Sequence, residues 1–225
     1  MPDSRGGFLA GAVRGRTTGD RDLYFVMDLF WYFSVLAAFY STHSVLAAEG
    51  VKKKAAARFP LSTRYYRLFY NLQSVLWLCL VVWHYRLLDQ QLLFDPGWWR
   101  WMGGMSVFSG CYVSMAALER YDLGHFLGWR QVSQPGATEF SKLETKGWNG
   151  LVRHPLYFGL LLLTVGGFLW FPTDVHLITA VLTTVYLVVG SRLEEHKLIG
   201  HFGDAYREYR TTVPGLLPFS FLKRK

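Results

Sequence analysis

The stretch that decides the fold runs from Arg153 to Glu195 and reads RHPLYFGLLLLTVGGFLWFPTDVHLITAVLTTVYLVVGSRLEE. It contains two apolar segments, 156–171 and 175–190, which are separated only by residues 172–174. Apolar runs of this length are typical of buried or membrane helices. The intervening proline and polar residues end one helix and begin the next. The sequence therefore predicts a tight helical hairpin.

Three further apolar stretches precede this hairpin, at 23–48, 68–88 and 98–118. A helix that crosses a bilayer needs about 20 apolar residues, with a range of about 17–25. Charged residues make up only 18% of the chain and hydrophobic residues 51%, whereas about 25% of a typical soluble domain is charged. We therefore predict an all-α integral membrane protein, a bundle of about five transmembrane helices. A soluble all-α bundle is the alternative, and five long stretches with few charges weigh against it.

The same patterns divide the chain into three parts. Residues 1–22 are rich in Gly and Arg and are expected to form a disordered tail. Residues 23–219 form the membrane domain, and 220–225 form a short basic tail. The first apolar run is about twice the length of a signal-peptide core, and 46–48 is a poor cleavage site. We therefore expect a retained helix rather than a cleaved signal peptide.

The basic residues indicate an orientation. The two loops at 49–67 and 119–153, together with the tail from Arg192, carry 18 of the 24 Lys and Arg residues; the other side carries six. Cytoplasmic loops are enriched in Lys and Arg, so the N-terminus is predicted outside and the C-terminus in the cytoplasm, in a bacterial inner membrane. The net charge of +8 then reflects topology and contact with membrane lipids rather than nucleic-acid binding.

Small residues mark one face of the third apolar stretch. Ser106, Gly110 and Ser114 follow one another at intervals of four residues. Small side chains on one face allow helices in lipid to approach closely. The sequence therefore predicts close packing of this helix against a neighbour.

The polar residues of the hairpin are predicted to meet at one level. Arg153, His154 and Tyr157 open its first helix, and Glu194 and Glu195 follow its second. A helix of about 17 residues rises about 25 Å and the second returns by a similar length, so both sets reach the cytoplasmic face. Charges at helix ends are often only solvated or in contact with headgroups, which is the alternative interpretation. Adjacent glutamates point about 100° apart, so the sequence leaves open which of them matters more.

These residues also resemble a known signature. The motif R-H-P-x-Y, followed 36 residues later by E-E, resembles that of the isoprenylcysteine carboxyl methyltransferase superfamily of membrane enzymes. The resemblance covers about residues 24–219, and the upstream part is similar to bacterial methanethiol S-methyltransferases and NnrU-type proteins. The other matching positions are 43–45, 66–68, 70–71, 122–128, 131, 202–203, 206, 209, 213–214 and 217–218.

The resemblance implies a bundle of membrane helices whose C-terminal part forms a cytoplasmic pocket for S-adenosylmethionine. It implies that His154 and Tyr157 contact this cofactor and that Glu194 or Glu195 holds its amino group. By the same resemblance, Arg153 would orient an anionic or thiolate acceptor. Three further residues are weaker candidates for lining the pocket: Gln131, Tyr206 and Tyr209.

Methyl transfer from a sulfonium is an in-line displacement, in which positioning supplies most of the catalysis. The expected function is therefore S-adenosylmethionine-dependent methylation of a thiol or lipophilic acceptor. Two alternatives stay open: an NADPH-dependent membrane reductase of related fold, and a non-enzymatic membrane protein of the nurim or NnrU kind. The sequence does not identify the acceptor or the oligomeric state.

The remaining polar residues give weaker signals. The histidines outside the signature show no H-x-x-x-H or H-E-x-x-H spacing, so no metal site is expected, although a haem or metal pair is the alternative. His43 is expected to form hydrogen bonds within the bundle. Asp28 lies in the first apolar run, and either faces a polar interior or lies near the outer interface. Cys79 and Cys111 lie in apolar runs and predict neither a disulfide framework nor a zinc site.

Overall fold

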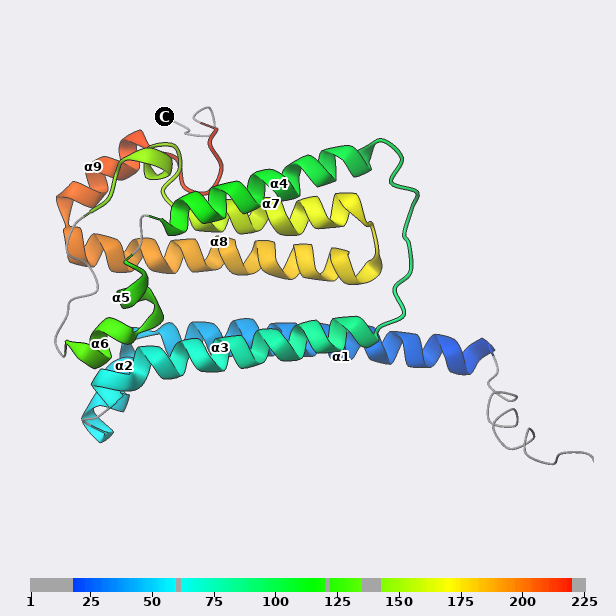
Figure 1. Cartoon of the computed structure of the whole chain (residues 1–225), viewed down its shortest axis with the longest axis horizontal. Coiled ribbons are helices and arrows are strands. Elements are labelled where there is room, and N and C mark those ends of the chain that lie inside the picture. Colours follow the sequence, from blue (N-terminus) through cyan, green and yellow to red (C-terminus); the bar gives the residue numbers. More distant parts are fainter. Residues whose placement is uncertain (1–17, 60–61, 120–121, 135–142, 220–225) are drawn as a thin grey trace, which may run out of the picture.

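The computed structural model describes residues 18–59, 62–119, 122–134 and 143–219, and this part of the chain is helical apart from its connecting segments (Figure 1). The predicted all-α class is confirmed. The helices are α1 (Thr18–Ala47), α2 (Glu49–Arg58), α3 (Ser62–Leu87), α4 (Trp99–Leu118), α5 (Leu123–Leu127), α6 (Trp129–Ser133), the 3-10 helix η1 (Gly147–Gly150), α7 (Pro155–Trp170), α8 (Asp174–Phe202) and α9 (Asp204–Thr212).

The long helices form two groups. Helices α4, α7 and α8 lie side by side, and α1 and α3 form a second pair below them in Figure 1. Helices α1 and α8 join the groups through a core of Tyr32, Leu36, Val81 and Val175, all buried. Helices α7 and α8 are antiparallel and separated by three residues, which confirms the predicted hairpin.

Small residues set the distance between α4 and α7. A Cβ atom on Gly110 would lie 2.8 Å from the backbone oxygen of Gly159, and one on Gly166 would lie 2.8 Å from the Cβ of Ser106. The Ser106 hydroxyl donates to the backbone oxygen of Leu162 across the same interface, at 2.9 Å. The predicted close packing of the small-residue face is therefore confirmed, with α7 as the neighbour.

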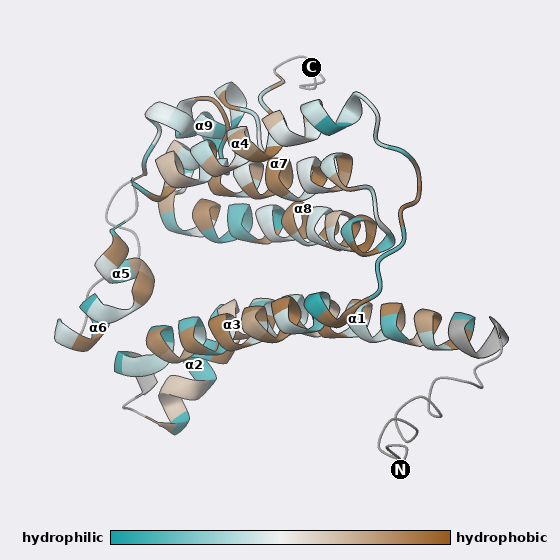
Figure 2. Ribbon diagram, turned by 45° about the vertical axis from the view of Figure 1, so that its right-hand side comes forward, coloured by the Kyte–Doolittle hydropathy of each residue, from teal (hydrophilic) through white to brown (hydrophobic). Residues whose placement is uncertain are grey.

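Fewer helices meet the length and apolarity needed to cross a membrane than the sequence predicted. Within the described residues, two segments are long and apolar enough to span a bilayer, Asp22–Ala47 of α1 and the whole of α8; α7 is apolar but shorter. Helix α3 carries polar and basic side chains in its first half, and α4 is rich in Trp, Gly and Ser. Many large hydrophobic side chains are nonetheless exposed, including Trp101 at 78% and Phe108 at 77%. Hydrophobic residues occur along all the long helices (Figure 2). Such an apolar surface is typical of contact with lipid, but the five-helix span stays a prediction.

Two helix bounds differ from the expectation. Helix α1 begins at Thr18, inside the expected 1–22 tail, whose first 17 residues lie outside the described part, as does the expected tail at 220–225. Helix α8 continues to Phe202 instead of ending near Gly190. Its 29 residues extend about 43 Å, which exceeds the roughly 30 Å hydrocarbon core. Its polar last turns therefore extend beyond the apolar part, at the end of the molecule where α2, α5, α6 and α9 gather (Figure 1).

Candidate functional site

The two ends of the hairpin meet at His154. Helix α7 begins at Pro155, the first-turn position predicted for this proline, and His154 is the residue that precedes it. The His154 side chain is 4% exposed, with Nδ1 3.4 Å from Glu194 Oε2 and Nε2 3.4 Å from Glu195 Oε1. The structure therefore confirms the prediction that residues from the two ends of the hairpin lie close together.

Arg153 is held by several partners at once. Its Nε donates to Glu195 Oε1 at 2.8 Å, and its Nη2 donates to the same oxygen. Its Nη1 donates to the backbone oxygen of Val213 at 2.6 Å. The Arg153 and Glu195 side chains are only 11% and 13% exposed. These contacts favour a role in fixing Glu195 and the C-terminal segment, whereas the acceptor-clamp role stays a prediction.

The segment after α9 closes over the start of α7. The backbone N–H of Arg153 donates to the oxygens of Pro214 (2.9 Å) and Gly215 (3.0 Å), and that of His154 also donates to Gly215 (3.3 Å). Arg210 of α9 adds a second cation, with Nε 3.4 Å from Glu195 Oε2. Sequence reasoning did not select Arg210, although it lies four residues after Tyr206 and therefore on the same face of α9.

The two glutamates have different surroundings. Glu195 contacts two arginines and His154 and is 13% exposed. Glu194 is 36% exposed, and His154 is the ion-pair partner that the structure gives it. Glu194 is therefore better placed to bind a ligand, whereas the Glu195 carboxylate is already engaged by side chains of the protein.

Three tyrosines surround this cluster. The Tyr157 ring stacks on the His154 ring, with centroids 5.5 Å apart and planes at 16°. Tyr206 is 1% exposed, and its buried hydroxyl has no hydrogen-bond partner within the described residues. The Tyr209 hydroxyl donates to the backbone oxygen of Asn149 at 2.5 Å, which ties α9 to η1. A buried hydroxyl without a partner is unfavourable, so Tyr206 marks a place where a ligand atom would be stabilised.

The charges of this cluster shift its pKa values. Burial lowers the pKa of His154, but hydrogen bonds and charges from Glu194 and Glu195 outweigh it, so the pKa ends above the usual 6.5. Burial raises the pKa of Glu195, but His154 and Arg153 outweigh it and bring the pKa down to about 2. Burial, followed by the charge of Glu195, raises the pKa of Tyr206 far above 10. The surroundings therefore favour an ionised Glu195 and a neutral Tyr206 phenol, and the two glutamates stabilise the protonated form of the His154 ring.

Gln131 lies apart from this cluster. It belongs to α6, which packs against α3 and α5, and its Nε2 donates to the backbone oxygen of His125 at 3.2 Å. Its Oε1 and the Nε2 of His125 are buried without a hydrogen-bond partner among the described residues. The structure therefore brings together Arg153, His154, Tyr157, the two glutamates, Tyr206 and Tyr209, but places Gln131 in a separate unit. In the sequence, His125 falls within the matching stretch 122–128 and is one of the histidines without metal-ligand spacing.

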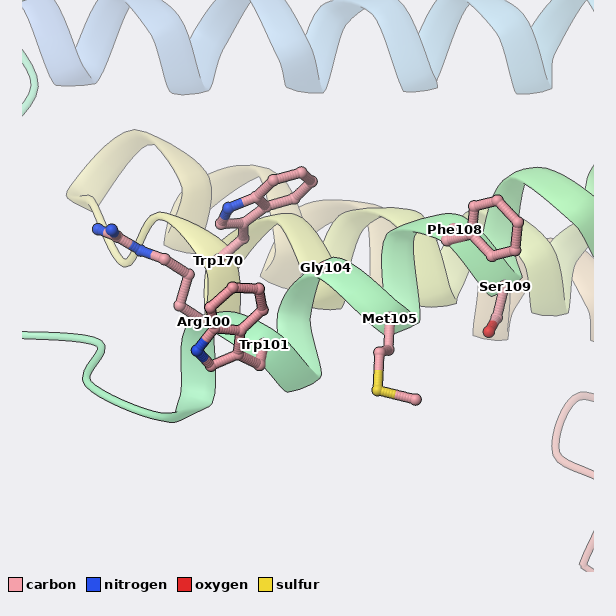
Figure 3. A pocket seen from close by; sticks show the side chains of 7 residues that line it. All are labelled: Arg100, Trp101, Gly104, Met105, Phe108, Ser109 and Trp170. Carbon is pink, nitrogen blue, oxygen red and sulfur yellow. The ribbon is translucent and has the colours of Figure 1, made fainter.

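A groove of about 570 Å³ lies at the other end of α4 and α7 (Figure 3). Its lining includes Arg100 and Trp101 from the start of α4 and Trp170 from the end of α7. Tryptophan and arginine together are typical of a membrane–water interface. Trp170 lies 16 residues after His154, about 24 Å along the helix, so this groove is separate from the His154 cluster. The expected cofactor pocket stays a prediction.

A comparison with known protein families identifies the family of this chain. The family model described as NnrU protein matches residues 32–217, which covers both groups of helices and the whole cluster around His154. The chain belongs to the NnrU protein family. This match confirms the resemblance to NnrU-type proteins.

Individual relatives agree with this membership. The chain is 32% identical over 197 residues to methanethiol S-methyltransferase 2 of Bradyrhizobium diazoefficiens, covering 85% of this chain and 73% of that protein. It is 30% identical over 203 residues to the methanethiol S-methyltransferase of Mycobacterium tuberculosis, covering 82% and 76%. A plant relative is more distant: protein-S-isoprenylcysteine O-methyltransferase B of Arabidopsis thaliana is 36% identical over 88 residues, 36% of this chain and 42% of that protein. No solved structure matches the chain.

Proposed function

We propose that this NnrU-family protein is an integral membrane methyltransferase that uses S-adenosylmethionine and methylates a small or lipophilic thiol. The carrying observation is the meeting of Glu194, His154 and the unpartnered hydroxyl of Tyr206 at the end of the hairpin. The relatives named as methanethiol S-methyltransferases support the reaction class and the thiol acceptor.

The residues present suit the cofactor's chemical groups. A carboxylate such as Glu194 suits an ammonium, and the N–H of an imidazole such as His154 suits a carboxylate. The face of the Tyr157 ring suits a sulfonium. The buried Tyr206 hydroxyl supplies a hydrogen bond that no described residue uses. The donor set therefore fits an amino acid joined to a nucleoside.

The protein's own contribution is positioning. The cofactor, when bound, supplies an electrophilic methyl group. Arg153 and Arg210 fix Glu195, Glu195 and Glu194 fix the His154 ring, and the ring supports Tyr157 by stacking. Well-oriented reactants gain about 7–11 kcal/mol relative to free encounter. This network of contacts suits the positioning of reactants.

The membrane arrangement is part of the proposal. Five spanning helices, α1, α3, α4, α7 and α8, would place the His154 cluster at the cytoplasmic face of a bacterial inner membrane, with the N-terminus outside. The gathering of α2, α5, α6 and α9 at one end supports this orientation (Figure 1). A reporter fused after Lys225 should be cytoplasmic and one fused near the N-terminus external. Two cytoplasmic termini would contradict the five-helix count.

The test of function uses the full chain purified in detergent. Calorimetry should show binding of S-adenosylhomocysteine, and labelled S-adenosylmethionine should transfer its methyl group to members of a thiol panel. Binding of NADPH without binding of the nucleoside sulfide would favour the reductase alternative. Binding of neither ligand would favour a non-enzymatic membrane protein.

A further inference from the structure

A second polar group lies inside the bundle, where α1, α3 and α8 meet. We name His43, Tyr70, Ser74 and Tyr186 the His43 cluster. His43 Nδ1 lies 3.0 Å from Ser74 Oγ, and Tyr70 Oη lies 2.5 Å from His43 Nε2. The Tyr186 ring meets the His43 ring edge-on, with centroids 6.2 Å apart. An ionisable side chain within an apolar helix is costly and typically has a function.

The hydrogen bonds fix the tautomer of His43. The Ser74 hydroxyl donates its only proton to the backbone oxygen of Tyr70 at 2.8 Å, so it acts as an acceptor towards His43. His43 Nδ1 therefore carries a proton, and Nε2 accepts the hydrogen bond from the Tyr70 hydroxyl. The cluster thus holds a neutral imidazole whose basic nitrogen faces a phenol.

The cluster shares one face of α8 with the His154 site. Tyr186, Gly190 and Glu194 follow at intervals of four residues, and residues at this spacing lie on one face of a helix. A Cβ on Gly190 would lie 3.8 Å from both Cε2 and Oη of Tyr157. The polar face therefore runs from Glu194 past Tyr157 to Tyr186 and His43, about 12 Å along the helix.

Within the described part of the chain, the side chains that the structure records in contact with His43 are uncharged. They are Phe39 on α1, Tyr70 and Ser74 on α3, and Tyr186 on α8. Glu194 stands two turns further along α8, and Lys197 donates to the backbone oxygen at the end of α1. A proton accepted by His43 would therefore be a new charge in an apolar environment, and it must leave again after each turnover.

We propose that His43, acting through Tyr70, removes the proton of the acceptor thiol. The inference rests on the proposed thiol methylation, because an alkyl thiol is mostly protonated at pH 7 and even cysteine is only a few per cent thiolate. The thiol S–H bond breaks, its proton goes to the Tyr70 oxygen, and the Tyr70 proton moves to His43 Nε2. The sulfur keeps the electron pair and bonds to the methyl carbon, while the carbon–sulfonium bond breaks and its pair stays on the donor sulfur. The imidazolium then releases its proton to water.

The test compares acceptors of different acidity. For an alkyl thiol, His43→Gln and Tyr70→Phe should each lower kcat/KM at pH 7 by about 100-fold or more, the range for general base catalysis. For an aromatic thiol that is already a thiolate at pH 7, the loss should be under about threefold. Equal losses with both acceptors would show a structural role and overturn the proposal, as would unchanged rates with both.

Tyr32→Phe is the matched control. Tyr32 also lies on α1 and bonds to α8, through Thr179 at 2.7 Å, but it is 11 residues, about 16 Å, from His43. This variant should keep both rates. If the unaltered protein methylates no thiol, the proposed function fails before His43 is tested.

A readout independent of turnover uses labelled histidine without cofactor. The NMR signal that is missing from the His43→Gln spectrum should show a protonated Nδ1 and an unprotonated Nε2 at pH 7. The opposite tautomer, or a charged ring at that pH, would overturn the proposal.

Discussion

The sharpest prediction separates Glu194 from Glu195, which the sequence could not rank. Each is replaced by glutamine, which keeps the shape and removes the charge. Glu195 is buried against Arg153, His154 and Arg210, whereas Glu194 is 36% exposed beside His154. We expect Glu195→Gln to act on the fold and Glu194→Gln to act on the ligand.

The magnitudes differ accordingly. Removing one partner of a buried ion pair costs about 3–5 kcal/mol, because the other charge is left unpaired. For a chain of this size that corresponds to a fall in Tm of roughly 6–20 °C. Glu194→Gln removes one charge-assisted hydrogen bond to the ligand's ammonium, about 1.5–3 kcal/mol, so affinity should fall about 10- to 100-fold. Its Tm without ligand should stay within about 2 °C of the parent.

The assay pairs thermal unfolding with calorimetry of S-adenosylhomocysteine on the same detergent preparations. The matched glutamine variants control for each other, since they differ by one position on the same helix. If Glu194→Gln unfolds early while Glu195→Gln keeps its Tm and loses only affinity, the assignment of the two glutamates is reversed and the reasoning from burial is refuted.

Three further outcomes follow from the same contacts. Arg153→Lys should lower both Tm and S-adenosylhomocysteine affinity, the latter by about tenfold or more. The reason is that an ammonium cannot reach Glu195 and the Val213 oxygen together. Retained affinity with lost methyl transfer would instead support the acceptor clamp. Gly110→Ala should cost about 1–3 kcal/mol by overpacking α4 against α7, whereas a Cβ on Gly104 meets nothing within 4 Å, so Gly104→Ala should not destabilise. The pKa of His154 is raised, so its stabilising contribution is complete below about pH 6.5 and is lost as pH rises through the folded pKa. The pKa of Glu195 is lowered, so its contribution is complete above about pH 4.5 and is lost as pH falls towards about 2. Tm measured against pH should therefore peak between these limits, and a flat profile would contradict both shifts.

The sequence predicted the hairpin and its consequence correctly. Two apolar segments joined by three residues require antiparallel helices of similar length, so Arg153 and His154 had to meet the residues near 194 and 195. The spacing of Ser106, Gly110 and Ser114 likewise predicted close packing, because small side chains on one face of an apolar helix let a neighbouring helix approach closely. These predictions rested on local patterns that the tertiary structure could not easily override.

Contacts made by irregular segments were not predictable in this way. Arg153 uses its donors on backbone oxygens at 213–215, where the chain returns from α9, and no local pattern marks such a return. Helices α5 and α6 have five residues each, too few to show a periodicity that would place Gln131. The interpretation of Arg153 as a clamp came from the family resemblance, which does not show that Glu195 and the Val213 oxygen engage its guanidinium.

The rotation of α8 about its own axis was only partly predictable. The spacing of its residues is visible in the sequence, but which face is buried is known only from the structure. Thr183, Leu187 and Ser191 are buried at intervals of four residues, and the same interval leads to Glu195. Glu194 is one residue earlier and therefore about 100° away, towards the side that carries Tyr186 and Gly190. Helix α8 thus assigns one carboxylate to the protein interior and the other to the polar face shared with His43. If that face holds the reactants, substitutions along it, such as Gly190→Leu, should reduce methyl transfer more than Ser191→Ala on the packed stripe, measured as kcat/KM at matched Tm. The opposite order would show that the reactants lie elsewhere.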